Sequence, residues 1–249
     1  MSAELIVPLI RDVAPRDRFE PASSVADRCA IRFGRAIPRE MFQEALSILI
    51  DAGELQCAGD NVKRVEWDAP ERDLYPGLER LLCARDFLDD VGVQEQAYVF
   101  HETASGGRTG TGQFSRPDFT LATIRRFRFD PSKHLDVMTF EVKNRAGTNL
   151  LGVHEALAHS RFAHYSCVVI PHSKLHPETV ELTRDACAEH GLGLITFQIK
   201  AIEPSVELSK LTLDLAPVRK SPDPTRVEQF IVDRFPSEKQ RALEKMANS

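Results

Sequence analysis

Three strand-like segments that follow one another closely constrain the fold more than any other part of the chain. They cover residues 93–102, 117–129 and 134–144. A Gly/Ser/Thr-rich loop at 104–113 and an Asp-Pro-Ser turn at 130–132 connect them. Because consecutive strands joined by short turns pair with their neighbours in opposite directions, this region is expected to form an antiparallel meander.

Further elements precede and follow the meander. They are expected to be a helix at 73–90, a helix at about 150–164, a strand at 166–171, a helix at 177–191 and a strand at 192–200. The last strand–helix–strand step predicts a right-handed parallel crossover. The sequence therefore predicts a mixed α/β sheet with helices on both faces.

The N-terminal part of the chain has a weaker pattern. Residues 1–36 show little periodicity, and three prolines interrupt them. Residues 37–53 then predict a helix that starts at Pro38 and stops at a glycine, and a hairpin signal follows around 59–61. A helix followed by a hairpin is how a winged-helix module ends; a small packing or dimerisation element is the alternative.

The C-terminal part combines a strand pattern with charged, proline-containing sequence. A strand at 206–215 precedes SPDP at 221–224, and a charged helix begins at about Thr225. The expected organisation is an N-terminal accessory module at 1–70, a core at 71–200, and a C-terminal strand and charged helix tail at 201–249.

Composition indicates a globular cytoplasmic protein. Hydrophobic residues make up 42% of the chain and charged residues 28%, and no apolar run is long enough to span a bilayer. The N-terminus lacks the basic region and cleavage site of a signal peptide. The cysteines are scattered without a CxxC pair, which argues for reduced thiols and against a zinc ribbon. They are Cys29, Cys57, Cys83, Cys167 and Cys187.

Charge is distributed unevenly along the chain. The total is −5, but residues 105–165 contain nine basic residues against five acidic ones, a local net charge of +4. A locally positive segment on an acidic protein is compatible with a surface that binds a polyanion. A solvated sheet face explains the same composition equally well.

Two carboxylates and a lysine are expected to meet at one end of the hairpin formed by the second and third strands. A tight turn near Asp130 and Pro131 would place Asp118 opposite Lys143 and within diagonal reach of Glu141. Glu141 and Lys143 are two residues apart and therefore project from the same face. A surface ladder of ion pairs is the structural alternative.

This arrangement suits metal-dependent hydrolysis of a phosphodiester. The carboxylates of Asp118 and Glu141 are hard oxygen ligands of the kind that Mg²⁺ prefers, with Mn²⁺ as an alternative. Such an ion polarises the scissile phosphate, while Lys143 can position or deprotonate the attacking water.

The segment SRPDFTLATIRRFRFDPSKHLDVMTFEVKN, residues 115–144, resembles the PD-(D/E)xK nuclease superfamily. Pro117-Asp118 corresponds to its PD element, and Glu141 with Lys143 to its ExK element. The resemblance covers residues 73–200 and implies a restriction-endonuclease-like αβββαβ core with a mixed sheet. In that superfamily the preceding helix often carries another acidic residue, and Glu79 occupies that place as a further metal ligand.

The helix after the third strand is rich in polar side chains. Its candidate functional residues are His154, Glu155, His159, Arg161 and Tyr165. The two histidines stand five apart, whereas zinc proteases of the HExxH type need them four apart, so we reject that interpretation. The expected phosphate contacts are Arg108, Arg116, Arg145 and Arg161. The loop containing Arg108 lacks the Lys-Ser/Thr ending of a P-loop, so an NTPase is not indicated.

The function expected from these features is a magnesium-dependent endonuclease that acts on DNA, in restriction, antiviral defence or repair. Two alternatives remain. One is a non-catalytic DNA-binding regulator that uses the N-terminal module, and the other is a nuclease subunit active only within a larger complex. The chain is expected to act as a homodimer or within a larger defence complex. The N-terminal module would then serve in recognition or in dimerisation. No membrane partner is expected.

Overall fold

The chain divides into two compact units in the computed structural model. The model describes residues 3–15, 18–51, 54–64, 69–93, 97–104, 116–145, 147–172, 175, 177–201 and 206–248. The first unit comprises residues 1–69 with 198–209, and the second comprises 70–197 with 210–249.

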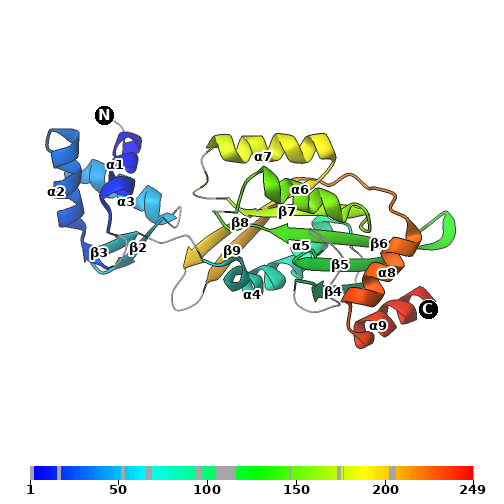
Figure 1. Ribbon diagram of the computed structural model, residues 1–249. Coiled ribbons are helices and arrows are strands. Elements are labelled where there is room, and N and C mark those ends of the chain that lie inside the picture. The colour runs from blue at the N-terminus through cyan, green and yellow to red at the C-terminus, as the bar shows by residue number, and fades with distance from the viewer. Residues whose placement is uncertain are drawn as a thin grey trace. The chain divides into compact units, whose positions relative to one another are not determined.

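Helices and a small sheet make up the N-terminal part of the first unit (Figure 1). The elements are η1 (Ala3–Leu5), α1 (Val7–Val13), β1 (Glu20–Pro21), α2 (Ala22–Phe33), α3 (Arg39–Asp51), β2 (Leu55–Ala58) and β3 (Asn61–Arg64). The strands pair antiparallel in the order β1-β3-β2. The hairpin predicted around 59–61 is therefore present, as is the helix predicted at 37–53.

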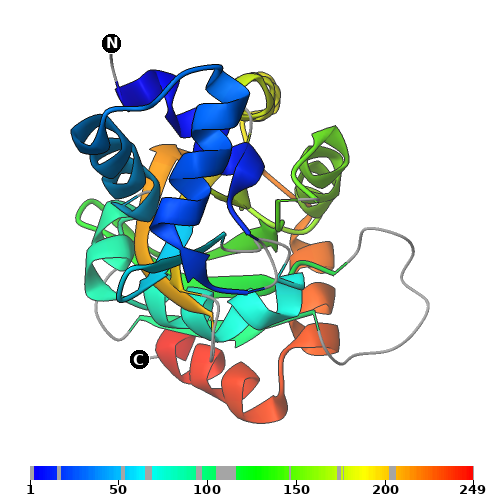
Figure 2. The same cartoon turned by 90° about the vertical axis from the view of Figure 1, so that its left-hand side faces the viewer.

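The two helices α1 and α2 lie where little periodicity was expected. α2 buries only Val25 and Cys29 among its twelve residues, so its apolar stripe is too sparse to stand out in the sequence. Both helices nevertheless contribute to a shared core with α3 and the small sheet, in which Ile6, Ile10 and Leu49 are fully buried. Figure 2 shows α1, α2 and α3 close together.

Six strands form one mixed sheet in the remainder of the chain (Figure 1). The elements are α4 (Glu71–Leu82), α5 (Arg85–Asp90), β4 (Tyr98–Glu102), β5 (Phe119–Phe127), β6 (Asp130–Val142), α6 (Leu150–His159), β7 (Tyr165–Pro171), α7 (Pro177–His190), β8 (Gly193–Ala201), β9 (Glu207–Leu215), α8 (Pro224–Arg234) and α9 (Ser237–Asn248). Neighbours follow sequence order from β4 to β9. β4, β5 and β6 are antiparallel, and β6, β7 and β8 are parallel, so the predicted mixed α/β sheet is confirmed.

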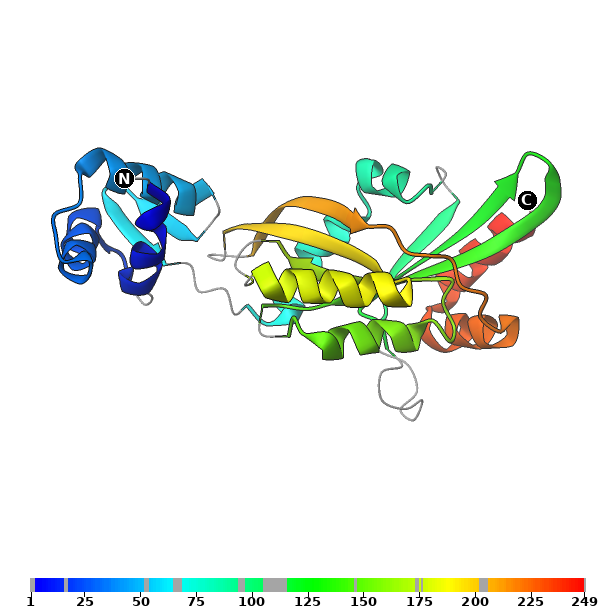
Figure 3. The same ribbon diagram turned by 90° about the horizontal axis from the view of Figure 1, so that it is seen from above.

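Helices cover both faces of this sheet (Figures 1 and 3). α6 and α7 lie side by side on one face, where α6 packs on β6 and β7. α5 lies on the other face, and its Phe87 ring is 6.1 Å from the ring of Phe140 in β6. Because side chains alternate along a strand, Phe140 and Glu141 of β6 point to opposite faces. Glu141 therefore faces α6.

The β5–β6 hairpin has a different register from the one expected. Phe119 pairs with Phe140, so continuing the ladder places Asp118 beside position 141 and not opposite Lys143. The turn lies at residues 128–129, earlier in the chain than the expected turn near Asp130 and Pro131, and a β-bulge lies beside it. The difference in pairing is two residues, and a strand has a period of two, so every side chain keeps its predicted face.

Two helices that were expected to be continuous are each divided. The helix predicted at 73–90 forms α4 and α5, which meet at residues 83–84, and the C-terminal helix forms α8 and α9, which meet at Phe235 and Pro236. Proline cannot donate the next helical hydrogen bond, so Pro236 favours the second break. No helix within the described ranges has both the length and the apolar character needed to cross a membrane.

Candidate functional site

Asp118 and Glu141 lie next to one another at one end of the β5–β6 hairpin. Asp118 directly precedes β5, and its backbone N–H donates to the carbonyl oxygen of Phe140, 3.1 Å away. Both carboxylates are buried, with 8% of Asp118 and 6% of Glu141 exposed. The predicted meeting of these two residues therefore occurs, although through a shifted register.

Hydrogen bonds hold the Asp118 carboxylate from two sides. The hydroxyl of Tyr75, in α4, donates to Oδ1, and the backbone N–H of Val142 donates to Oδ2 at 2.6 Å. Burial raises the pKa of Asp118 above its ordinary value, although the bonds from Tyr75 and Val142 act in the opposite direction. Asp118 is thus fixed in orientation before any ligand binds.

Glu141 is held at only one of its two oxygens. Lys143 Nζ lies 2.7 Å from Oε1 of Glu141 and 2.5 Å from Oε2 of Glu155. The other oxygen of Glu141, Oε2, is buried and has no hydrogen-bond partner among the described residues. Burial and the nearby charge of Asp118 raise the pKa of Glu141.

Lys143 is a protonated group in this arrangement. Burial by itself would lower the pKa of its ammonium. The charges and hydrogen bonds of Glu141 and Glu155 outweigh that effect, and the pKa is raised. Lys143 is therefore suited to orienting a ligand or stabilising negative charge, and less suited to removing a proton.

One face of α6 completes the surroundings of Lys143. Asn149 caps the helix by accepting a hydrogen bond from the Leu151 N–H. Gly152 and Glu155 then lie three residues apart on the same face. A Cβ placed at Gly152 would lie 3.0 Å from Cγ and 3.1 Å from Cε of Lys143. The absence of a side chain at Gly152 lets the lysine stem run against the helix and reach Glu155.

His159 extends the same face of α6 by a further turn. Its side chain is 1% exposed, and its Nε2 lies 3.7 Å from Oε2 of Glu141. Burial, together with the positive charges of Lys143 and Arg161, lowers the pKa of this imidazole to about 3. His159 was one of several candidates that the sequence offered on this helix, but Arg161 was preferred as the phosphate contact.

The acidic residue that α4 contributes to the site is Glu71, and the predicted Glu79 lies elsewhere. Glu71 Oε1 is 3.4 Å from the backbone N–H of Asn144, and its charge acts on Asp118 and Lys143. Glu79 is exposed, and its charge contributes to raising the pKa of Cys83. The helix was expected to begin at residue 73, so Glu71 was left outside it; Pro70 followed by Glu71 was the available signal.

The arginines predicted to contact phosphate have different surroundings. Arg108 lies outside the described residues. Arg116, Arg145 and Arg161 are exposed, and Arg161 Nε donates to the carbonyl oxygen of Ala158 at 2.9 Å near the end of α6. Arg161 is also close enough to lower the pKa of His159.

The residues around Lys143 fit a divalent cation. We call Glu71, Asp118, Glu141 and Glu155, together with Lys143, the carboxylate cluster. Carboxylates outnumber ammonium groups in it by four to one, and burial makes such an imbalance costly. The unpartnered Oε2 of Glu141 offers a hard oxygen ligand for Mg²⁺ or Mn²⁺. Among the described residues, no three His, Cys, Asp or Glu side chains already stand in a metal-binding arrangement, so binding requires some rotation of these carboxylates.

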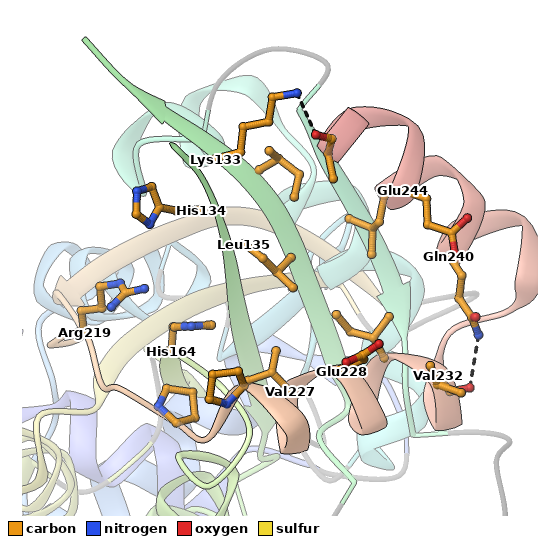
Figure 4. Close-up of a pocket in the computed structure, with 16 residues that line it drawn as sticks. Lys133, His134, Leu135, His164, Arg219, Val227, Glu228, Val232, Gln240 and Glu244 are labelled. Carbon is orange, nitrogen blue, oxygen red and sulfur yellow. Dashed lines mark hydrogen bonds between the residues drawn. The ribbon is translucent and has the colours of Figure 1, made fainter. Parts of the chain in front are cut away.

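A separate cavity lies at the other end of the hairpin (Figure 4). Its volume is about 560 Å³, and Leu135, Val227 and Leu243 contribute to its apolar lining from β6, α8 and α9. Lys133 spans one side by donating from Nζ to the carbonyl oxygen of Ala247 at 2.7 Å, as the sticks in Figure 4 show. None of the predicted site residues lines this cavity, so it is distinct from the carboxylate cluster.

Comparison with known proteins provides no functional assignment. No family model matches the chain, and no curated protein matches it. A solved structure, of a protein of unknown function from Silicibacter pomeroyi, is similar at 16% sequence identity over 72% of this chain and 91% of that chain, with a TM-score of 0.38.

Proposed function

We propose that this protein is a divalent-metal-dependent nuclease of the PD-(D/E)xK type, with Mg²⁺ or Mn²⁺ as its cofactor and DNA as its substrate. The observation that carries the proposal is the carboxylate cluster. Asp118 and Glu141 converge there from two paired strands, both buried, with Lys143 beside them and one carboxylate oxygen left without a partner.

The order of elements around the cluster supports the same proposal. Apart from α5, which lies between α4 and β4, the elements run α4, β4, β5, β6, α6 and β7, that is, helix, three antiparallel strands, helix and a strand parallel to β6. This is the αβββαβ order that the sequence resemblance implies. The positions of the two carboxylates also support the proposal, because Asp118 directly precedes β5 and Glu141 lies near the end of β6.

Asp118, Glu141 and Lys143 have different roles in the proposed hydrolysis. Asp118, already oriented by Tyr75 and Val142, and Glu141, through its free Oε2, hold the cation. When bound there, a divalent cation polarises the phosphate and lowers the pKa of water. Lys143 remains an ammonium and orients the attacking water or stabilises the charge that develops on the phosphate.

Two further groups support this division. Glu71, in place of Glu79, supplies the acidic group that α4 brings to the cluster. The exposed Arg116, Arg145 and Arg161 provide contacts to the nucleic-acid backbone, which carries a negative charge at every phosphate. Such contacts position a substrate without reading its sequence.

The first unit favours a recognition role and is the basis of the second candidate function. Its elements run helix, strand, helix, helix, strand, strand, and the sheet order is β1-β3-β2. The sequence predicted only the final helix and hairpin of a winged-helix module, and the structure adds α1, β1 and α2 before them. A DNA-binding regulator with an inactive nuclease core would use the same unit, and a nuclease subunit that depends on a partner would use it for assembly.

Cleavage of plasmid DNA tests the proposal. Wild-type protein is incubated with supercoiled plasmid and Mg²⁺ or Mn²⁺, beside Glu141→Gln and Glu79→Gln. Both substitutions remove one carboxylate, but only Glu141 belongs to the carboxylate cluster. We expect wild type and Glu79→Gln to nick or linearise the plasmid and Glu141→Gln to leave it intact. Equal cleavage by all three proteins would refute the assignment.

The same experiment separates the alternatives. A regulator binds DNA in EDTA as well as in Mg²⁺, loses affinity steeply as salt increases, and loses binding when residues 1–69 are deleted. A partner-dependent subunit leaves plasmid intact alone and cleaves it after addition of the protein encoded beside it. DNA binding without cleavage in either metal identifies the regulator, and cleavage that depends on the added protein identifies the partner-dependent subunit.

A further inference from the structure

His159 is a buried histidine whose ring nitrogens make no hydrogen bond to the described residues. The side chain is 1% exposed, and neither Nδ1 nor Nε2 makes a hydrogen bond to any described residue. A buried imidazole ordinarily donates from one ring nitrogen and accepts at the other. A ring with neither bond is an exception that needs a physical explanation.

The carboxylate oxygen of Glu141 that faces this ring also lacks a hydrogen-bond partner among the described residues. His159 Nε2 lies 3.7 Å from Oε2 of Glu141, and that oxygen has no hydrogen-bond partner within the described part of the chain. A separation of 3.7 Å is too long for a hydrogen bond. Two neighbouring ligand atoms that each lie about 2.1 Å from an octahedral ion are separated by about 3 Å. Oε2 of Glu141 and Nε2 of His159 are therefore within a small side-chain rotation of the spacing of two ligands that share a cation.

The helix holds His159 in this position. The carbonyl oxygen of His159 accepts hydrogen bonds from the N–H groups of Phe162 and Ala163, at 3.0 and 2.9 Å. The Phe162 ring lies 5.7 Å from the imidazole, on the side of the C-terminal helices. Backbone and ring contacts thus leave the imidazole facing the strand that carries Glu141.

We propose that His159 is a nitrogen ligand of the cation and that the site consequently takes Mn²⁺ in preference to Mg²⁺. The inference rests on the proposed metal-dependent function and adds a ligand and a metal preference to it. Mg²⁺ favours an all-oxygen shell and releases its water reluctantly, whereas Mn²⁺ accepts imidazole together with carboxylates. Asp118 and Glu141 supply the oxygens, and His159 supplies the nitrogen that discriminates between the two ions.

The test is direct detection of nitrogen bound to the ion. Full-length protein is loaded with Mn²⁺ and studied by electron spin echo envelope modulation, which detects ¹⁴N coordinated to Mn²⁺. We expect ¹⁴N modulation in wild type, its loss in His159→Gln, and its retention in His154→Gln. His154 is the matched control because it lies on the same helix but is exposed. Calorimetry should show Mn²⁺ affinity reduced about tenfold or more in His159→Gln, with Mg²⁺ affinity unchanged.

The outcomes separate this inference from the proposed function. If wild type binds Mn²⁺ and cleaves plasmid but shows no ¹⁴N modulation, His159 is not a ligand and only this inference fails. If wild type binds neither ion, Asp118 and Glu141 do not form a metal site and both proposals fail. A wild-type spectrum without ¹⁴N modulation overturns the inference even if His159→Gln does not fold.

Discussion

The middle and the open end of the β5–β6 hairpin both bury carboxylates, but they neutralise them differently. In the middle, where it pairs with Thr123, Asp136 is 3% exposed and is paired with two arginines. Arg219 lies 2.9 Å from its Oδ1 and Arg125 lies 3.2 Å from its Oδ2. At the open end, the ion pairs that described residues make within the carboxylate cluster involve one lysine, Lys143, which contacts Glu141 and Glu155.

This difference distinguishes a structural ion pair from a site prepared for a ligand. A buried carboxylate is tolerated when cations and hydrogen bonds compensate for lost hydration, as they do at Asp136. The carboxylate cluster lacks that compensation and keeps an unpartnered oxygen on Glu141. Binding of a cation at the carboxylate cluster therefore stabilises the folded protein, whereas a cation near Asp136 brings no such stabilisation.

The largest expected effect comes from Glu141→Gln. Removing this carboxylate eliminates a metal ligand, so plasmid cleavage should fall by about a thousandfold or more, as for loss of a principal group that stabilises a transition state. Rates of nicking under single-turnover conditions measure the change. Asp136→Asn is the control from the middle of the hairpin, and its rate should stay within about threefold of wild type. A comparable loss of rate in both variants would show that the two sites do not differ in function.

A smaller effect, on stability, is expected from Asp136→Asn. The substitution leaves Arg125 and Arg219 without their shared carboxylate, and breaking one side of a buried ion pair is destabilising. We expect the free energy of unfolding to fall by about 2 kcal/mol, less than for a fully buried pair because Arg219 is 45% exposed. Urea denaturation measures it. An unchanged midpoint would mean that Asp136 is not held by these arginines in solution.

The stability of metal-free protein should decrease as pH rises. Burial raises the pKa of Glu141 from 4.5 to about 9, so the folded state binds its proton more tightly than the unfolded state does. The stabilisation is complete below pH 4.5 and is lost between 4.5 and about 9. Melting temperatures in EDTA across that range should fall in wild type and in the control Glu79→Gln, with a smaller slope in Glu141→Gln. Parallel curves for all three proteins would contradict the burial of a titrating Glu141.

The smallest effect is expected from Gly152→Ala. Its new methyl would press on the Lys143 stem, while alanine favours the helix by about 1 kcal/mol relative to glycine. We expect cleavage to slow by about tenfold through displacement of the ammonium, with unchanged or higher thermal stability. A fall in both quantities would indicate that the substitution disturbs the helix itself and not the lysine.

The composition of the site could be predicted in part from the sequence. Asp118, Glu141 and Lys143 were identified because strand alternation places residues two apart on one face, and an error of two residues in register does not alter that. Glu71 was missed because the helix start was placed two residues too late. The proximity of His159 to Glu141 was not predictable, because it depends on how closely α6 packs on β6 and β7.

Local pattern by itself determined the strands, the direction of their pairing and the face on which the key residues lie. These properties follow from the period of the strand and the length of the connections, which are encoded within a few residues of each other. Only the tertiary structure decided which of these charges are neutralised. Asp136 pairs with Arg219, which is 83 residues away in the sequence. Among the described residues, Glu141 has an ion pair with Lys143 and lies 3.7 Å from His159, whose ring nitrogens make no hydrogen bond. Balance of charge is a property of packing between distant segments, and it is what separates the structural ion pair of Asp136 from the candidate active site.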